Sequence, residues 1–124
     1  MVVGGDWNVV PSGQPLGLNP DLCGSLAVPN PINAEEMRSL ARDNNLVDIY
    51  RETHIAVSAF TFKHFSGQKI ARSRLDFFLV SRQALGWGRP AIVSNILPRL
   101  SQQFDHKAVS LDLGMLKTKI AMRR

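Results

Sequence analysis

The chain has 124 residues and a formal net charge of +5; 44% of its residues are hydrophobic and 20% are charged. These proportions are typical of globular chains and exclude disordered and collagen-like proteins. The single cysteine, Cys23, excludes an internal disulfide framework, and no spacing of Cys and His resembles a zinc site. No apolar run is long enough for a membrane span, and residues 1–6 do not resemble a secretory signal. We therefore expect a protein that is neither secreted nor bound to a membrane.

Positive charge is concentrated in the second half of the chain. Residues 1–62 have a net charge of −4, from three arginines and seven acidic residues, whereas residues 63–124 have a net charge of +9. A basic half favours binding to a polyanion such as nucleic acid. A solubilising surface followed by a basic tail would give the same balance, because four of the 12 basic residues of that half lie within residues 117–124.

The first half of the chain predicts a strand, a long loop and a helix. Residues 1–5 are typical of the end of a buried strand, which a glycine pair then interrupts. Residues 11–33 hold most of the prolines and predict an irregular loop. Asn33 is expected to cap a helix over residues 34–44, and Glu36 would complete a capping-box pair.

The rest of the chain predicts mainly strands. Residues 46–50 predict a short strand or a final turn, and residues 60–62 predict a strand. The clearest strand covers residues 74–80, where alternation places Leu75, Phe77 and Leu79 on one face and Arg74, Asp76 and Phe78 on the other. Beyond it we expect a helical turn over residues 82–85 and strands over residues 91–96 and 107–113.

Three polar clusters lie at strand ends or inside apolar runs, where a polar side chain costs free energy unless a partner uses it. The first is Gly5-Asp6-Trp7-Asn8, directly after the first strand. Its acid and its amide are two residues apart, so they project to the same side of an extended chain. The same residues are also typical of an Asx turn that closes a strand.

The other two clusters contain the remaining candidate acids and a histidine. Asp76 lies inside an apolar strand, where aspartate needs a partner charge, a metal or a hydrogen-bonded histidine. An ion pair with Arg74 would meet the same need. Asp105 and His106 open the last strand, where one could hold a cation while the other addresses a substrate oxygen or a water. A capped loop is the more common setting for this dipeptide.

The order of these clusters resembles the C-terminal half of the endonuclease/exonuclease/phosphatase superfamily, the fold of DNase I and of the abasic-site endonucleases. The family's Gly-Asp-Phe/Trp-Asn, Ser-Arg-Ile/Leu-Asp and Ser-Asp-His motifs correspond to Gly5-Asp6-Trp7-Asn8, Ser73-Arg74-Leu75-Asp76 and Asp105-His106. Residues 45–51, 60–62 and 77–81 also resemble the retrotransposon-encoded endonuclease branch. The resemblance covers residues 1–114, which would form a partial domain, and leaves residues 115–124 as a basic tail or linker.

The resemblance implies an α/β (α+β) fold, namely the C-terminal half of a four-layered sandwich with mostly antiparallel sheets and flanking helices. It also implies hydrolysis of phosphodiester bonds in DNA with Mg²⁺ or Mn²⁺ as the cofactor. His106 would contact the scissile phosphate and act in acid/base catalysis, and Asp76 would hold its ring. Asp6 and Asn8 would orient and activate the attacking water, and Asp105 would bind the cation together with Asp6.

Further residues are candidates for contacts with the substrate. The basic half and the resemblance together suggest Lys63, Arg72, Arg74 and Lys107 as phosphate contacts, with Ser73 beside them. The aromatic rings of Trp7 and Phe62 could pack near the site, although an aromatic residue next to a strand belongs more often to the core.

The chain departs from the family in two ways. Phe104 stands where the family usually has Ser, and the N-terminal half of the family, with the glutamate that is its principal metal ligand, has no counterpart here. We therefore expect part of a larger domain, of low stability by itself. Its expected partners are DNA and either a complementary N-terminal half or a reverse transcriptase domain of the same polyprotein. A retroelement origin would place it in the nucleus or the cytoplasm.

Two other functions fit the same residues. Relatives that cleave small phosphorylated substrates differ from nucleases mainly in their loops, so a phosphatase of this kind is one alternative. The other is a non-catalytic remnant that binds nucleic acid without cutting it. Binding that depends on salt, without cleavage that depends on Mg²⁺, would indicate this remnant.

Overall fold

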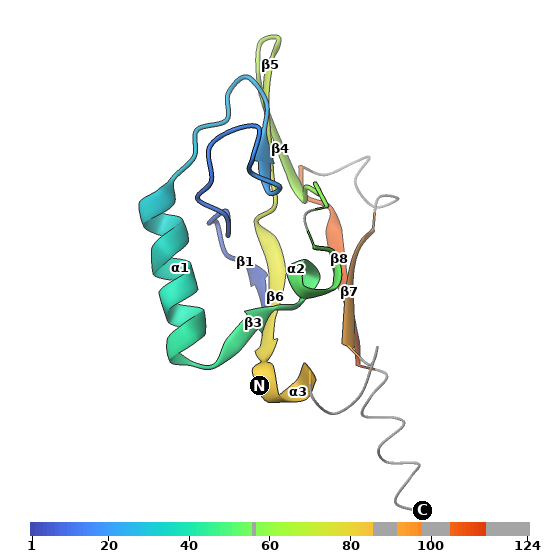
Figure 1. Ribbon diagram of the computed structural model, residues 1–124. Coiled ribbons are helices and arrows are strands. Elements are labelled where there is room, and N and C mark those ends of the chain that lie inside the picture. Colours follow the sequence, from blue (N-terminus) through green and yellow to red (C-terminus); the bar gives the residue numbers. More distant parts are fainter. Residues whose placement is uncertain (56, 86–91, 98–104, 114–124) are drawn as a thin grey trace, which may run out of the picture.

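The computed structural model describes residues 1–55, 57–85, 92–97 and 105–113 of the chain (Figure 1). The fold is mixed α/β, with antiparallel sheets and few helices, which confirms the prediction at this level. Its elements are β1 Val2–Asp6, β2 Leu22–Cys23, α1 Pro31–Asp43, β3 Leu46–Asp48, α2 Ile49–Thr53, β4 Phe62–Ser66, β5 Lys69–Ser73, β6 Asp76–Ser81, α3 Arg82–Leu85, β7 Ile92–Leu97 and β8 Ala108–Leu113. No helix in the described ranges is long and apolar enough to cross a membrane.

The strands form three small sheets, and within the described residues every pairing between them is antiparallel. In the first sheet β6 lies between β1 and β3, and in the second β5 lies between β2 and β4. The third sheet is the β7–β8 pair. In Figure 1, α1 lies on one side of the first sheet and α2 lies between β6 and the β7–β8 pair. The central strand β6 is therefore covered on both sides.

Strand β6 supplies the core to both of its faces. Phe77 and Leu79 pack with Leu46 and with the α1 residues Met37 and Ala41. Leu75, Phe77 and Leu79, which the alternation placed on one face, are all buried. The opposite face is buried as well, because Val80 and Phe78 pack against a group from β3, α2, α3 and β8, which consists of Val47, Ile49, Ala84 and Leu111.

Helix α1 begins earlier than its sequence pattern predicts. Its N-cap is Asn30, whose side-chain oxygen accepts a hydrogen bond from the backbone N–H of Asn33 at 3.1 Å. The prediction that Asn33 caps the helix together with Glu36 is therefore wrong. The reason is Pro31, whose fixed φ suits the first helical position and whose missing N–H costs nothing there.

The predicted strand over residues 60–62 also differs from the structure. The chain instead forms a hairpin of β4 and β5, joined by a two-residue turn in which Gly67 has a φ of +62°. Glycine adopts such a positive φ at little cost, and it is preferred at the first position of a tight hairpin turn. The sequence pattern did not predict this hairpin, because it contains polar residues such as Lys63, His64 and Lys69 and no long apolar run.

The remaining predictions agree with the structure in large part. Residues 46–50 contain both of the expected alternatives, since β3 runs directly into α2. Strand β6 begins at Asp76 instead of residue 74, because the N–H of Arg74 donates to the Asp21 carbonyl of the preceding loop. The predicted turn and the last two strands correspond to α3, β7 and β8. The predicted tail over residues 115–124 and the departure at position 104 lie outside the described residues.

Candidate active site

Three of the predicted catalytic residues come together at one end of the first sheet. Asp6 ends β1 and is the direct antiparallel partner of Asp76, which begins β6. His106 reaches them from the segment before β8, which is anchored by a bridge between His106 and Phe62. One ligand atom from each of Asp6, Asp76 and His106 lies within 4.8 Å of the other two. We call this group the Asp6–Asp76–His106 cluster.

The histidine ring lies between the two carboxylates. Its Nδ1 is 2.7 Å from Oδ2 of Asp76, and its Nε2 is 3.8 Å from Oδ2 of Asp6. Side-chain exposure rises from 18% for Asp76 through 37% for His106 to 49% for Asp6. An ionised carboxylate only accepts hydrogen bonds, so Nδ1 donates to Asp76, and Nε2 faces Asp6. The partner of Asp76 is therefore His106 and not Arg74.

Asp6 and Asn8 form the turn that closes β1. The backbone N–H of Asn8 donates to Oδ1 of Asp6 at 2.9 Å, and Asn8 has a φ of +52°. This is the Asx turn that the sequence offered as one alternative. The turn also serves the cluster, because it holds one carboxylate oxygen of Asp6 and leaves the other facing the histidine.

The indole of Trp7 points to the other side of the sheet. Its Nε1 donates to the Phe77 carbonyl at 2.9 Å, and its ring stacks on that of Phe77 at a centroid distance of 5.7 Å. Trp7 thus anchors the turn by packing with the core, and the structure does not bring it to the cluster. Phe62 does reach the cluster, since its ring lies 4.6 Å from the imidazole of His106.

Thr61 connects the segments that carry the cluster, and the sequence reasoning missed it. Its buried hydroxyl accepts hydrogen bonds from the backbone N–H groups of Leu75 and Asp76 at 2.9 and 3.1 Å. Its own N–H donates to the Ser73 carbonyl, and its carbonyl accepts from the N–H of Lys107 at 2.6 Å. Thr61 is therefore a positioning residue for both Asp76 and His106. A hydroxyl between two phenylalanines was the only signal in the sequence.

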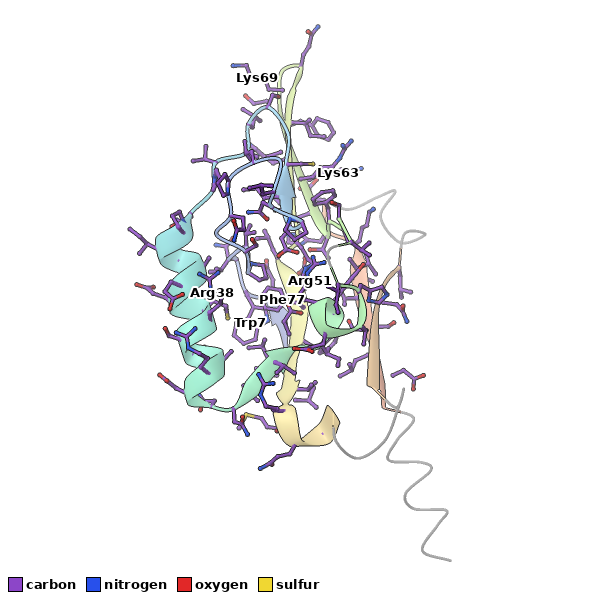
Figure 2. The ribbon with its side chains drawn as sticks, in the orientation of Figure 1. Trp7, Arg38, Arg51, Lys63, Lys69 and Phe77 are labelled. Atoms are coloured by element: carbon purple, nitrogen blue, oxygen red, sulfur yellow. The ribbon has the colours of Figure 1, made fainter. Side chains whose placement is uncertain are left out.

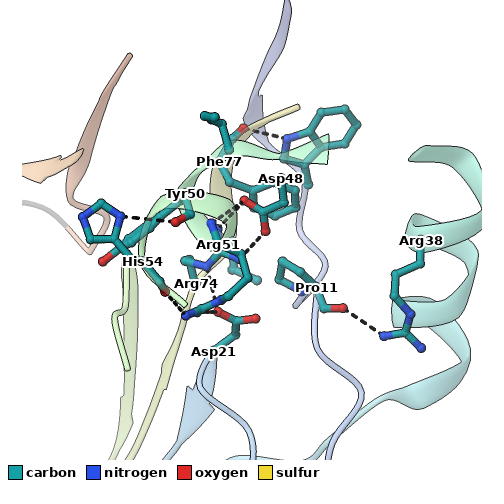
Figure 3. A network of polar contacts seen from close by, with 12 residues as sticks. Pro11, Asp21, Arg38, Asp48, Tyr50, Arg51, His54, Arg74 and Phe77 are labelled. Carbon is teal, nitrogen blue, oxygen red and sulfur yellow. Dashed lines mark hydrogen bonds and ion pairs between the residues drawn. The ribbon is translucent and has the colours of Figure 1, made fainter. Parts of the chain in front are cut away.

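Arg74 lies away from the cluster, within a buried ionic network (Figure 3). Its Nε donates to Asp21 at 2.7 Å, and its two terminal nitrogens donate to Asp48. Burial acts to lower the pKa of the Arg74 guanidinium, but the hydrogen bonds and charges of Asp48 and Asp21 outweigh it and raise that pKa. The guanidinium stays charged and has no surface left for a substrate phosphate. Ser73 is likewise buried, in β5.

The other predicted substrate contacts lie together at a separate pocket. Lys63, Arg72 and Lys107 line this pocket along with Asp105, the predicted second metal ligand. Asp105 is exposed and does not belong to the Asp6–Asp76–His106 cluster. Asp105 therefore lies with the basic side chains of this pocket.

The chemistry of the cluster decides how a divalent cation would fit. A cation held by all three side chains would displace the hydrogen bond between Asp76 and His106. Mg²⁺ usually needs only one or two carboxylates and keeps several of its waters. Asp6 would therefore suit a hydrated Mg²⁺ or Mn²⁺ and leave the His106–Asp76 pair intact.

Comparisons with known proteins identify no family for this chain. No protein-family model matches the chain, and a search of curated proteins finds no match either. The three motifs and the geometry of the cluster that they form are therefore the basis for inferring the function.

Proposed function

We propose that this chain is part of a metal-dependent endonuclease that hydrolyses phosphodiester bonds in DNA, with a DNase I-like fold of which it forms the C-terminal half. One observation supports the proposal most directly. The three ordered motifs, far apart in the sequence, meet with His106 held between two carboxylates. Resemblance to the retrotransposon-encoded branch makes a reverse transcriptase domain or a complementary N-terminal half the expected partner.

The roles follow from the atoms available. Asp6 orients a water beside the phosphate and accepts its proton, with Asn8 shaping the turn that holds this carboxylate. The water oxygen attacks phosphorus, the opposite P–O bond breaks, and the leaving oxygen takes a proton from solvent. His106 directs Nε2 at a phosphoryl oxygen, while Asp76 fixes the orientation of the ring through Nδ1. A bound Mg²⁺ would neutralise negative charge on the phosphate.

Nicking of supercoiled plasmid tests this function, with Mg²⁺ and with EDTA. Asp6→Asn and His106→Ala should each lower the nicking rate by a factor of about 10²–10⁴, the usual contribution of a positioned acid or base. Asp43→Asn and His64→Ala are matched controls, because both residues are exposed and lie outside the cluster. Equal nicking by the catalytic and control variants would contradict the proposal.

A non-catalytic nucleic-acid-binding remnant is the second candidate. One observation favours it. Nδ1 of His106 already occupies Asp76, so within the cluster Asp6 is the one carboxylate left to bind a cation. A folded chain that binds DNA in a salt-dependent manner and shows no nicking with Mg²⁺ would support this second function.

A further inference from the structure

Three basic side chains gather at a pocket that is separate from the cluster. Lys63 of β4, Arg72 of β5 and Lys107 line a cavity of about 420 Å³, together with Phe60, Thr61, Phe62 and Asp105. None of Asp6, Asp76 and His106 lines it. Figure 2 shows Lys63 at the side of the β4–β5 hairpin, and Lys69 lies near the hairpin tip. We call this cavity the basic pocket.

The strand register explains why these residues converge. Lys63 and Arg72 are direct partners in the hairpin. The N–H of Lys63 donates to the Asp105 carbonyl at 3.1 Å, so the segment before β8 extends the same ribbon. Side chains alternate across extended chains, which places Lys63, Arg72 and Lys107 on one side. His106 and Phe62 take the other side, where their rings meet. The basic pocket therefore lies behind the strand pair that carries His106.

Among the described residues that line the pocket, positive charges outnumber negative ones. Within the described ranges, Lys63, Arg72 and Lys107 form no ion pair with an acidic side chain. Arg38, Arg42, Arg51 and Arg74, by contrast, are all paired. Asp105 is the only acid among the seven lining residues, so the pocket carries two excess positive charges. Like charges held together repel one another, and an anion between them would relieve the repulsion.

We propose that the basic pocket binds a backbone phosphate of a polynucleotide, other than the phosphate at the Asp6–Asp76–His106 cluster. The inference rests on the proposed function and adds to it a second site for the phosphate backbone of the substrate. A polynucleotide carries a phosphate at every nucleotide, so one strand can fill both sites at once. A small ester with a single phosphate would occupy the cluster and leave nothing for this pocket.

The salt dependence of DNA binding tests the pocket without requiring cleavage. Fluorescence anisotropy with a labelled DNA duplex in EDTA gives the slope of log K against log salt concentration. Lys63→Gln, Arg72→Gln and Lys107→Gln should each reduce this slope by about 0.9, the value for one lost phosphate contact. The change in Kd between 50 and 200 mM salt should then be about 3.5-fold smaller for each variant.

Lys69→Gln is the matched control, because Lys69 is exposed on the same hairpin and does not line the pocket. Its slope should equal that of the wild type. Lys63→Arg and Lys107→Arg should keep the wild-type slope, which separates loss of charge from loss of packing. Circular dichroism of each variant checks folding.

Three results would overturn the proposal: no DNA binding by the wild type, unchanged slopes in all three pocket variants, or an equal reduction in Lys69→Gln. The same experiments distinguish failure of the pocket from failure of the proposed function. Reduced slopes in the pocket variants without any Mg²⁺-dependent nicking would support the pocket and favour the non-catalytic nucleic-acid-binding remnant over a working endonuclease. Nicking that requires Asp6 and His106, together with unchanged slopes, would support the endonuclease and contradict the pocket.

Discussion

The side chain of Thr61 holds the backbone that positions the cluster. Two backbone N–H groups, those of Leu75 and Asp76, share its buried hydroxyl as acceptor. An N–H group buried without a partner costs about 1–3 kcal/mol. The position of Asp76, and through it the orientation of His106, therefore depends on one side chain that takes no part in the proposed chemistry.

Thr61→Val should destabilise the chain by about 1–3 kcal/mol, because it keeps the shape of threonine and removes the acceptor of two N–H groups. Urea denaturation followed by circular dichroism measures this loss. Thr61→Ser retains the hydroxyl and should recover most of the nicking rate that Thr61→Val loses. Recovery of stability without recovery of nicking would show that Thr61 supports the fold and not the cluster.

At the scale of residues, the sequence predicted the members of the cluster better than their surroundings. Asp6, Asp76 and His106 could be singled out because each is a polar residue beside an apolar strand. Arg74 met the same criterion and has a different role. Its partners Asp21 and Asp48 are 53 and 26 residues away in the sequence, and local patterns carry no information on such pairings.

The start of α1 shows how a single residue sets the boundary of an element. Both Asn30 and Asn33 are suitable N-cap residues, and the helical spacing of apolar residues cannot separate them. The structure assigns the cap to Asn30, whose side chain accepts from the N–H of Asn33. A proline at the next position decides between the two, since it is well tolerated only in the first turn.

Asn30→Ala should lower the free energy of unfolding by about 1 kcal/mol, the typical cost of losing an N-cap side chain. Asn33→Ala is the matched control and should change it by less than about 0.5 kcal/mol, as expected for an exposed position away from such a feature. Thermal denaturation of both variants, side by side, measures the difference. A larger effect of Asn33→Ala than of Asn30→Ala would mean that Asn33 is the N-cap residue, as the sequence pattern predicted.

Strands were predictable where they are apolar and not where they are polar. β6 could be recognised because it is rich in aromatic and branched residues, whereas β4 and β5 together hold Lys63, His64, Lys69 and Arg72. The sequence signal for this hairpin is the glycine of its turn, Gly67, which adopts a positive φ. The polar hairpin matters for function, because it carries two of the three cations of the basic pocket.

At the scale of the whole molecule, one ionic network joins segments of the first and the second sheet. Arg74, between β5 and β6, contacts Asp21 of the long loop and Asp48 at the end of β3. Arg51 of α2 also pairs with Asp21, at 2.5 Å (Figure 3). Arg74 additionally lies 5.2 Å from the ring centroids of Tyr50 and Phe77. The network therefore holds the loop, both central strands and α2 in one arrangement.

Removal of the central cation should affect the entire fold. Arg74→Met keeps an unbranched side chain of moderate volume but leaves Asp21 and Asp48 without their main buried partner. Loss of one member of a buried ion pair costs about 3–5 kcal/mol, a large part of the 5–15 kcal/mol that stabilises a typical domain. We expect Arg74→Met to unfold at a lower temperature than the wild type and to show a single transition at lower urea concentration.

Arg38→Met is the matched control, since Arg38 pairs with Glu35 on the exposed face of α1. Exposed pairs contribute about 0–1 kcal/mol, so this variant should remain close to the wild type. Arg74→Lys should fall between the two, because an ammonium keeps the charge but cannot bridge two carboxylates with the geometry of a guanidinium. Equal stability of Arg74→Met and Arg38→Met would mean that the network contributes no more than a surface ion pair, and that apolar packing around β6 alone holds the loop in place.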